Sequence, residues 1–141
     1  MKIVIFILVI FIIDANGQGI SNRWVMGYSC CQTDFGGMDI DFANDSADIL
    51  IKQRYMNINC TVGSISDKNG NLLFISNGIY VANALDDTML NGSGLNPASY
   101  TTSRNHWGLA LPQGNLVIPF PNDSTKYYLF HETCDDVGGT Y

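Results

Sequence analysis

Residues 64–78 read SISDKNGNLLFISNG, and the way this stretch bends decides the fold class. An apolar run stops at Asp67-Lys68-Asn69-Gly70 and then resumes as Leu72-Leu73-Phe74-Ile75. An Asn-Gly pair supplies the positive φ that a tight hairpin requires, and an Asp before it can accept hydrogen bonds from backbone N–H groups two or three residues later. The sequence therefore predicts two antiparallel strands joined by a turn at residues 67–70.

The same stretch also offers oxygen ligands at the spacing of a calcium loop. Asp67, Asn69 and Asn71 stand at alternate positions. An EF-hand loop, however, has its Gly at the sixth position and a Glu six residues after that Gly. Here the Gly comes at the fourth position and Ser76 stands six residues beyond it. A calcium site at Asp67, Asn69 and Asn71 is thus the alternative to the turn, and we favour the turn.

Short apolar or alternating runs recur along the chain, separated by Gly, Asn, Asp and Pro, while helical periodicity is nearly missing. Met38, Ile40 and Phe42 alternate with Asp39 and Asp41, which predicts a strand with a buried apolar face and a wet acidic face. We expect residues 83–112 to be rich in loops. The strands that we predict cover 23–28, 38–42, 71–76, 79–81 after the break at Asn77-Gly78, and a last hairpin of 115–120 and 126–132, joined through 121–124. Residues 53–59 and 61–66 form either two further strands or one bent strand.

The segment around the predicted turn at 67–70 has a partial repeat, which we call the echo, near the end of the chain. Asp67 lies seven residues before Phe74, and Asp123 lies seven before Phe130, so the two segments match at an offset of 56. Repeats of about 40–50 residues built of short strands are typical of propeller blades. We expect an all-β fold of short antiparallel strands that forms a partial β-propeller of about two blades.

The N-terminus predicts export. Lys2 precedes an unbroken apolar run, Ile3 to Ile13, which is shorter than the roughly 20 residues of a membrane span and suits the apolar region of a signal peptide. Ala15-Asn16-Gly17 would place cleavage before Gln18. We expect residues 1–17 to be a signal peptide and 18–141 to form the partial propeller, with no membrane span after cleavage.

Composition excludes one class of partner. The net charge is −6 and the isoelectric point is near 4.4. No patch of Lys and Arg could neutralise phosphates, so nucleic acid is not an expected partner. A glycan or an extracellular protein is the kind of partner that we expect for an exported β protein.

Four cysteines remain after the predicted cleavage: Cys30, Cys31, Cys60 and Cys134. Export makes disulfides possible, and four cysteines allow three pairings that the sequence does not rank. A metal site is the alternative, but C-x-x-C spacing is absent. The segment HETCDD, 131–136, lacks a second His four residues after His131, and we expect neither a metal site nor a nucleophile pair there.

His106 and Trp107, in SRNHWGLALPQGN, are the residues that we single out for ligand binding. An aromatic face with polar neighbours can form a sugar-binding platform. More often such a Trp fills a core beneath a long loop, and this is the interpretation of Trp107 that we favour.

Several segments resemble the N-terminal region of large secreted or surface proteins of Bacteroidetes. Trp24 to Gly27 matches a W-x-x-G strand, Ser64 to Gly78 an S-I-S-D-x-x-G-N-L-L-F segment, and Gln113 to Pro121 a Q-G-x-L-x-I-P-x-P element. Many such proteins end in a type IX secretion or gliding-motility-associated C-terminal sorting domain. The resemblance implies a propeller-like region that carries no known catalytic residues.

The function that we expect is a secreted or cell-surface scaffold or binding module without a catalytic site or cofactor. The alternative is the N-terminal part of a larger exported hydrolase or adhesin whose site lies elsewhere. A closed propeller needs several four-stranded blades, so we also expect the chain to be a fragment of a longer protein.

Overall fold

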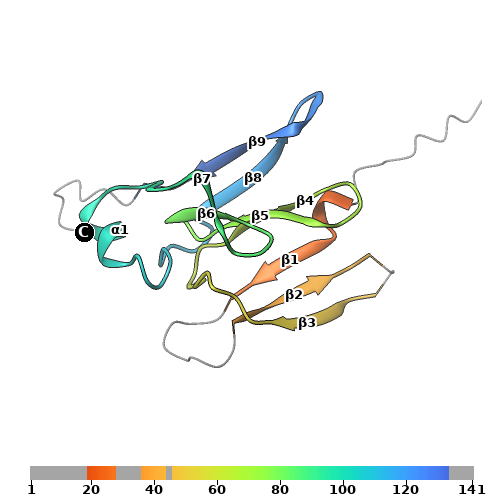
Figure 1. Cartoon of the computed structure of the whole chain (residues 1–141), viewed down its shortest axis with the longest axis horizontal. Coiled ribbons are helices and arrows are strands. Elements are labelled where there is room, and N and C mark those ends of the chain that lie inside the picture. The colour runs from red at the N-terminus through yellow and green to blue at the C-terminus, as the bar shows by residue number, and fades with distance from the viewer. Residues whose placement is uncertain (1–18, 28–35, 44–45, 134–141) are drawn as a thin grey trace, which may run out of the picture.

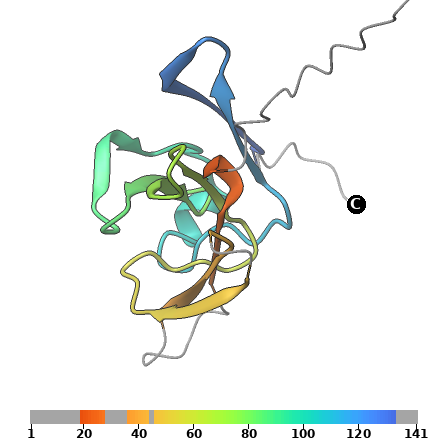
Figure 2. The same cartoon turned by 90° about the vertical axis from the view of Figure 1, so that its right-hand side faces the viewer.

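The structure is a computed structural model that describes residues 19–27, 36–43 and 46–133. These residues form three antiparallel sheets that lie one above another in chain order (Figures 1 and 2). The first sheet contains β1 (Arg23–Met26), β2 (Gly37–Asp41) and β3 (Asp48–Lys52). The second contains β4 (Gly63–Ser66), β5 (Leu72–Ser76), β6 (Tyr80–Asn83) and β7 (Thr88–Ser93), and the third contains β8 (Asn115–Phe120) and β9 (Asp123–His131). The all-β, antiparallel prediction is confirmed, while the predicted signal peptide, 1–17, lies outside the described residues.

The turn predicted at residues 67–70 is a hairpin turn between β4 and β5. The N–H of Asp67 donates to the carbonyl of Asn71 at 2.8 Å, and the N–H of Gly70 donates to the carbonyl of Asp67 at 3.0 Å. Gly70 has a φ of +83°, which a residue with a side chain rarely adopts. The turn therefore depends on Gly at this position, as the sequence predicts.

The second sheet packs on both of its faces. Its first strand, β4, contacts both β1 and β8. On one face lies the apolar core, to which the first sheet, the second sheet and the segment between them contribute Val25, Met56, Ile58, Leu72, Ile75 and Ala82. On the other face the side-chain amide of Asn115 donates to Ser76 Oγ at 3.0 Å, and the rings of Phe74 and Tyr127 meet edge to face at 5.4 Å.

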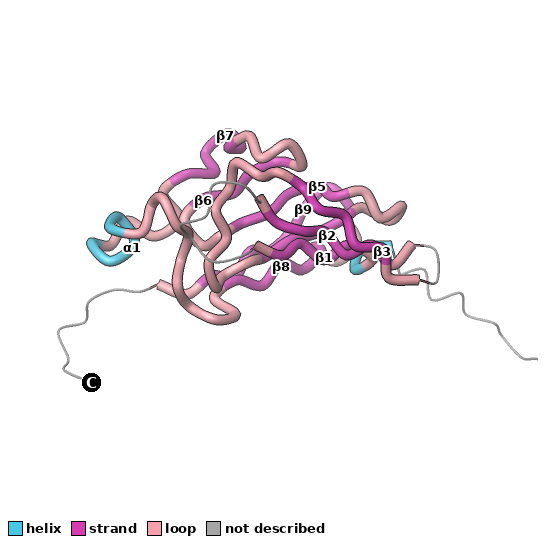
Figure 3. Tube along the Cα trace, turned by 90° about the horizontal axis from the view of Figure 1, so that it is seen from below, coloured by secondary structure: helices cyan, strands magenta, loops and turns pink. Residues whose placement is uncertain are grey.

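Two short helices stand at opposite ends of the molecule (Figure 3). The 3₁₀ helix η1 (Gly19–Ser21) precedes β1 and contacts β4, and α1 (Ser99–Ser103) follows β7. Neither they nor any other helix in the described part of the chain has the length and apolar character to cross a membrane.

One predicted strand, 53–59, is wrong. Its alternation is real, because Arg54, Met56 and Ile58 are buried while Tyr55 and Asn57 are exposed. The segment bends at Tyr55 and Met56 and buries every second side chain, and it pairs with no strand among the described residues. The strand β3 lies just before it instead, in a stretch for which we predicted none.

The predicted faces of β2 are also reversed. Asp39 is fully buried, whereas Met38 and Ile40 are only partly covered and Phe42 is exposed. Asp39 pairs with Val25 across the ladder, so both side chains point toward the core. The burial of a carboxylate here is possible because cations surround it.

The expectation of loops over 83–112 holds only in part. This stretch contains β7 and α1, and β7 is mostly exposed. The last hairpin is confirmed, but β9 begins at Asp123, so its turn is shorter than predicted and centres on Asn122 with a φ of +62°.

A buried ionic cluster links the first two sheets. Arg54 is 8% exposed and its guanidinium bonds Asp39 of β2 on one side and Asp86, in the turn between β6 and β7, on the other, the latter at 2.9 Å. Lys52 Nζ lies 2.9 Å from the second oxygen of Asp39, and the N–H of Tyr55 donates to Asp86 at 2.8 Å. A buried guanidinium needs such partners, since an unpaired buried charge is costly.

The variant Asp39→Asn should lower the free energy of unfolding by roughly 3–5 kcal/mol, because it leaves part of the Arg54 and Lys52 charge uncompensated next to the core. Urea unfolding followed by circular dichroism measures the loss. The matched control is Asp41→Asn, on the same strand, which breaks the more exposed pair with Arg23. Equal losses in both variants would contradict the role assigned to the cluster.

Candidate functional site

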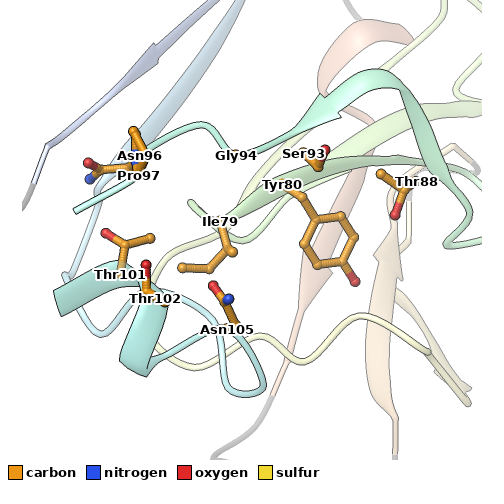
Figure 4. A pocket seen from close by; sticks show the side chains of 10 residues that line it. All are labelled: Ile79, Tyr80, Thr88, Ser93, Gly94, Asn96, Pro97, Thr101, Thr102 and Asn105. Carbon is orange, nitrogen blue, oxygen red and sulfur yellow. The ribbon is translucent and has the colours of Figure 1, made fainter. Parts of the chain in front are cut away.

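A half-open cleft of about 400 Å³ lies between β6, the chain around the end of β7, and α1 (Figure 4). Ligand pockets commonly measure about 300–1,000 Å³. In Figure 4, Ile79 lies near the middle of the cleft, and the other side chains surround it. The lining residues are Ile79, Tyr80, Thr88, Ser93, Gly94, Asn96, Pro97, Thr101, Thr102 and Asn105.

The turn before β6 positions Ile79 and Tyr80. Asn77 is buried, and its side-chain oxygen accepts the N–H groups of Ile79 at 3.0 Å and of Tyr80 at 3.2 Å. Its amide nitrogen donates to the carbonyl of Asn57 at 2.9 Å. The next residue, Gly78, has a φ of +83° and lies against Leu109, where a Cβ would have no room. The predicted Asn-Gly break thus fixes the start of β6 and the direction of its side chains.

Tyr80 has two environments. One side of its ring packs against the apolar core, and the side chain also lines the cleft. Burial, together with the nearby charge of Asp86, raises the pKa of its phenol. Tyr80 is therefore a neutral hydroxyl and an aromatic face at ordinary pH.

The opposite wall comes from α1. This helix has only five residues and no side-chain cap at its N-terminus, so its neighbours must hold it in place. Thr102 donates its hydroxyl to the carbonyl of Ala98 at 2.9 Å and is thereby satisfied. The hydroxyl of Thr101 is buried and has no hydrogen-bond partner among the described residues.

Chemically the cleft is polar but uncharged. None of its ten lining residues is an acid or a base. Within the described residues no group of three His, Cys, Asp or Glu side chains gathers anywhere as a metal site would require. The cleft can therefore offer hydroxyls, amides and an aromatic face, but no acid–base pair of its own.

No model of a protein family, no curated protein and no solved structure matches this chain. What the chain does must therefore be argued from its own geometry.

The predicted ligand-binding pair, His106 and Trp107, follows α1. Both are exposed, with Trp107 at 44%, and the carbonyl of His106 accepts the side-chain amide of Asn57 at 2.5 Å. Neither lines the cleft, although both are close in sequence to Asn105, which does. The interpretation that we favoured, in which Trp107 fills a core, is wrong, because nearly half of its surface is exposed.

The calcium candidates Asp67, Asn69 and Asn71 are engaged in the turn itself. One oxygen of Asp67 accepts the N–H groups of Asn69 at 2.8 Å and Asn71 at 2.9 Å. The other accepts the side-chain amide of Asn71 at 3.0 Å. These bonds lower the pKa of the Asp67 carboxyl and use the oxygens that a cation would need.

The cysteine predictions remain predictions. Cys60 is exposed, and Cys30, Cys31 and Cys134 lie outside the described residues. Of the HETCDD segment, 131–136, the structure describes only His131, Glu132 and Thr133.

The sequence did not predict the cleft because its lining residues form no recognisable motif. Thr88, Ser93, Thr101 and Asn105 all lie in the stretch that we predicted as loops. Small polar residues are what loops contain anyway. These residues come together only because β7 and α1 pack near β6 in the folded chain.

The Asp67 turn makes stability depend on pH. Its folded pKa lies below the unfolded value of about 3.9, so the contribution of this carboxylate is present above that pH and is lost as the pH falls through the folded pKa. Asp67→Ala should therefore be less stable than the wild type at pH 7, and the gap between them should narrow on acidification from pH 5 to pH 3. Thermal unfolding at several pH values measures this gap.

The control is Glu132→Ala at another exposed carboxylate. Subtracting each variant from the wild type removes the parallel acid dependence of Asp41 and Asp123, whose pKa values hydrogen bonds from Arg23 and Thr125, respectively, also lower. A gap for Asp67→Ala that stays constant from pH 7 to pH 3 would contradict the turn's electrostatic role.

Proposed function

We propose that this chain is a scaffold and ligand-binding module of an exported or cell-surface protein, built as part of a β-propeller-like stack, and that it is not an enzyme. The observation that carries the proposal is the stacking of three sheets in chain order through their first strands. Each sheet runs outward strand by strand, and β4 contacts both β1 and β8. Propeller blades are four-stranded antiparallel sheets; among the described residues the second sheet has four strands, the first has three and the third has two.

Both ends of the stack support a scaffold role. Residues paired directly across an antiparallel ladder point to the same face. The outer face of the first sheet is therefore apolar throughout, with Trp24, Met26, Met38, Ile40, Ile49 and Ile51. The outer face of the third sheet carries Leu116, Ile118, Phe120, Tyr128 and Phe130. Apolar surface of this extent is typical of interaction sites, and we propose that neighbouring sheets cover both faces in the exported protein.

The sequence supports the cellular assignment. Residues 1–17 have the layout of a signal peptide, and the segments around Trp24, Ser64–Gly78 and Gln113–Pro121 resemble exported Bacteroidetes proteins of the type IX secretion kind. The uncharged cleft supports binding rather than hydrolysis, since its lining includes no carboxylate pair or nucleophile–base pair.

Export is tested with a fusion of residues 1–24 to an alkaline phosphatase without its own signal, produced in a Gram-negative bacterium. This reporter needs disulfides and becomes active only outside the cytoplasm. We expect activity, and we expect the exported product to begin at Gln18. The variant Leu8→Arg, which places a charge in the apolar run, should abolish activity. An inactive wild-type fusion, or an equally active Leu8→Arg fusion, would contradict export.

The scaffold role is tested by methionine oxidation. Met26 on the outer face of the first sheet and Met89 on β7 are almost equally exposed, at 43% and 41%. Both should oxidise in the isolated chain, where the fully buried Met56 should not. In the protein at the surface of its own cells, Met26 should be protected while Met89 still oxidises. Equal oxidation of Met26 in both preparations would overturn the covering of this face.

A further inference from the structure

We propose that the cleft between β6, β7 and α1 binds a neutral saccharide. This inference deepens the proposed binding-module function and rests on it. The cleft combines an apolar floor, one aromatic face and a rim of hydroxyl and amide groups, which come from three separate parts of the fold (Figure 4).

The lining matches the two surfaces of a sugar ring. A sugar presents C–H groups on its faces and hydroxyls around its edge. Ile79 and the Tyr80 ring offer an apolar surface for the face, and aromatic rings serve this role because they combine large contact area with a polar tip. Thr88, Ser93 and Asn105 are exposed and line the rim, where their hydroxyls and amide can both donate and accept hydrogen bonds.

The charge balance selects a neutral ligand. Among the residues that the structure describes, none that lines the cleft carries a charge, so this lining has no group to pair with a sulfate, phosphate or uronate. The whole chain carries −6, and Asp86 lies close enough to raise the pKa of Tyr80. The net charge of the chain therefore gives an anionic sugar no long-range attraction, and the described lining offers a cation no carboxylate ligand.

A buried hydroxyl in the wall points independently to a ligand. Thr101 is 3% exposed, lines the cleft and leaves its hydroxyl without a partner among the described residues. A buried hydroxyl without a hydrogen bond costs free energy, so a partner in the cleft would be favourable. Thr101→Val, below, tests whether this hydroxyl takes part in binding.

A second cleft, of about 580 Å³, lies near the Asp67 turn and makes a useful contrast. Asp67, Lys68 and Asp123 line it, so its character is charged. The carboxylates of Asp67 and Asp123 already accept hydrogen bonds from their own turns. The first cleft is therefore the better match to a neutral ligand, and the two can be blocked separately.

The test titrates the mature chain with three probes: cellotriose, N,N′,N″-triacetylchitotriose and, as the anionic comparison, trigalacturonic acid. Calorimetry measures binding, and Trp107 beside the cleft's Asn105 supplies a fluorescence readout. We expect at least one neutral probe to bind and the anionic probe to bind at least tenfold more weakly. Absence of binding by both neutral probes, or tighter binding of the anionic probe, would overturn the proposal.

Two matched variants locate the site. Ser93→Trp fills the cleft from an exposed strand position, and Ser124→Trp places the same bulk at the second cleft. Ser93→Trp should abolish neutral-sugar binding and Ser124→Trp should preserve it, with thermal unfolding confirming that both remain folded. Binding that survives Ser93→Trp, or that only Ser124→Trp removes, would overturn the assignment.

Thr101→Val tests the buried hydroxyl with almost no change of shape. The loss of one neutral hydrogen bond should weaken binding roughly 2- to 10-fold, and unchanged affinity would remove Thr101 from the site. The saccharide proposal and the proposed scaffold function can fail separately. If no sugar binds while the phosphatase fusion is exported and Met26 is protected, the saccharide proposal is wrong and the scaffold function stands.

Discussion

The buried guanidinium of Arg54 is the constraint on which the arrangement of the first two sheets depends. It lies in an irregular segment, yet it bonds Asp39 in one sheet and Asp86 in the turn of the other. Apolar packing alone would let the two sheets slide, because dispersion contacts have little directional preference. Two charge-assisted bonds from one planar group fix both the separation and the register. The apolar core around Met56 packs between sheets whose relative position the ion pairs of Arg54 fix.

The same cluster reaches the cleft. Asp86 has a φ of +67° and sits in the β6–β7 turn, which Asn83 stabilises by accepting the N–H groups of Leu85 and Asp87. By holding this turn, Arg54 holds the hairpin that carries Tyr80 on one strand and Ser93 on the other. Asp86 also raises the pKa of Tyr80. The ionic cluster and the cleft are therefore connected through the β6–β7 turn. The charged side chains of the cluster pair with one another between the sheets, and the described lining of the cleft offers hydroxyls and amides.

Local sequence signals predicted the local structure well and the tertiary structure poorly. The Asp67–Gly70 turn, the Asn77-Gly78 break and the last hairpin follow from backbone preferences that a few neighbouring residues fix. The face of β2 was misjudged because the burial of Asp39 depends on Lys52 and Arg54, which lie on β3 and on the segment after it. The alternation over 53–59 reflects a segment that buries every second side chain against the core. No local pattern tells whether a partner strand lies beside such a segment. The cleft, made of residues from 79 to 105, is a tertiary feature of the same kind.

The two Asp turns show what the 56-residue echo encodes. Asp67 lies in the turn between β4 and β5, whereas Asp123 is the first residue of β9 and follows its turn, and each carboxylate accepts the N–H of the residue two positions later. The turns nevertheless differ: Gly70 takes the positive φ in one and Asn122 in the other. At the offset of 56, Gly70 corresponds to Lys126 within β9 and not to Asn122, so the echo repeats a local Asp–backbone contact and not the position at which the chain reverses. Either Gly or Asn can occupy the left-handed region, so each turn is fixed by its own residues.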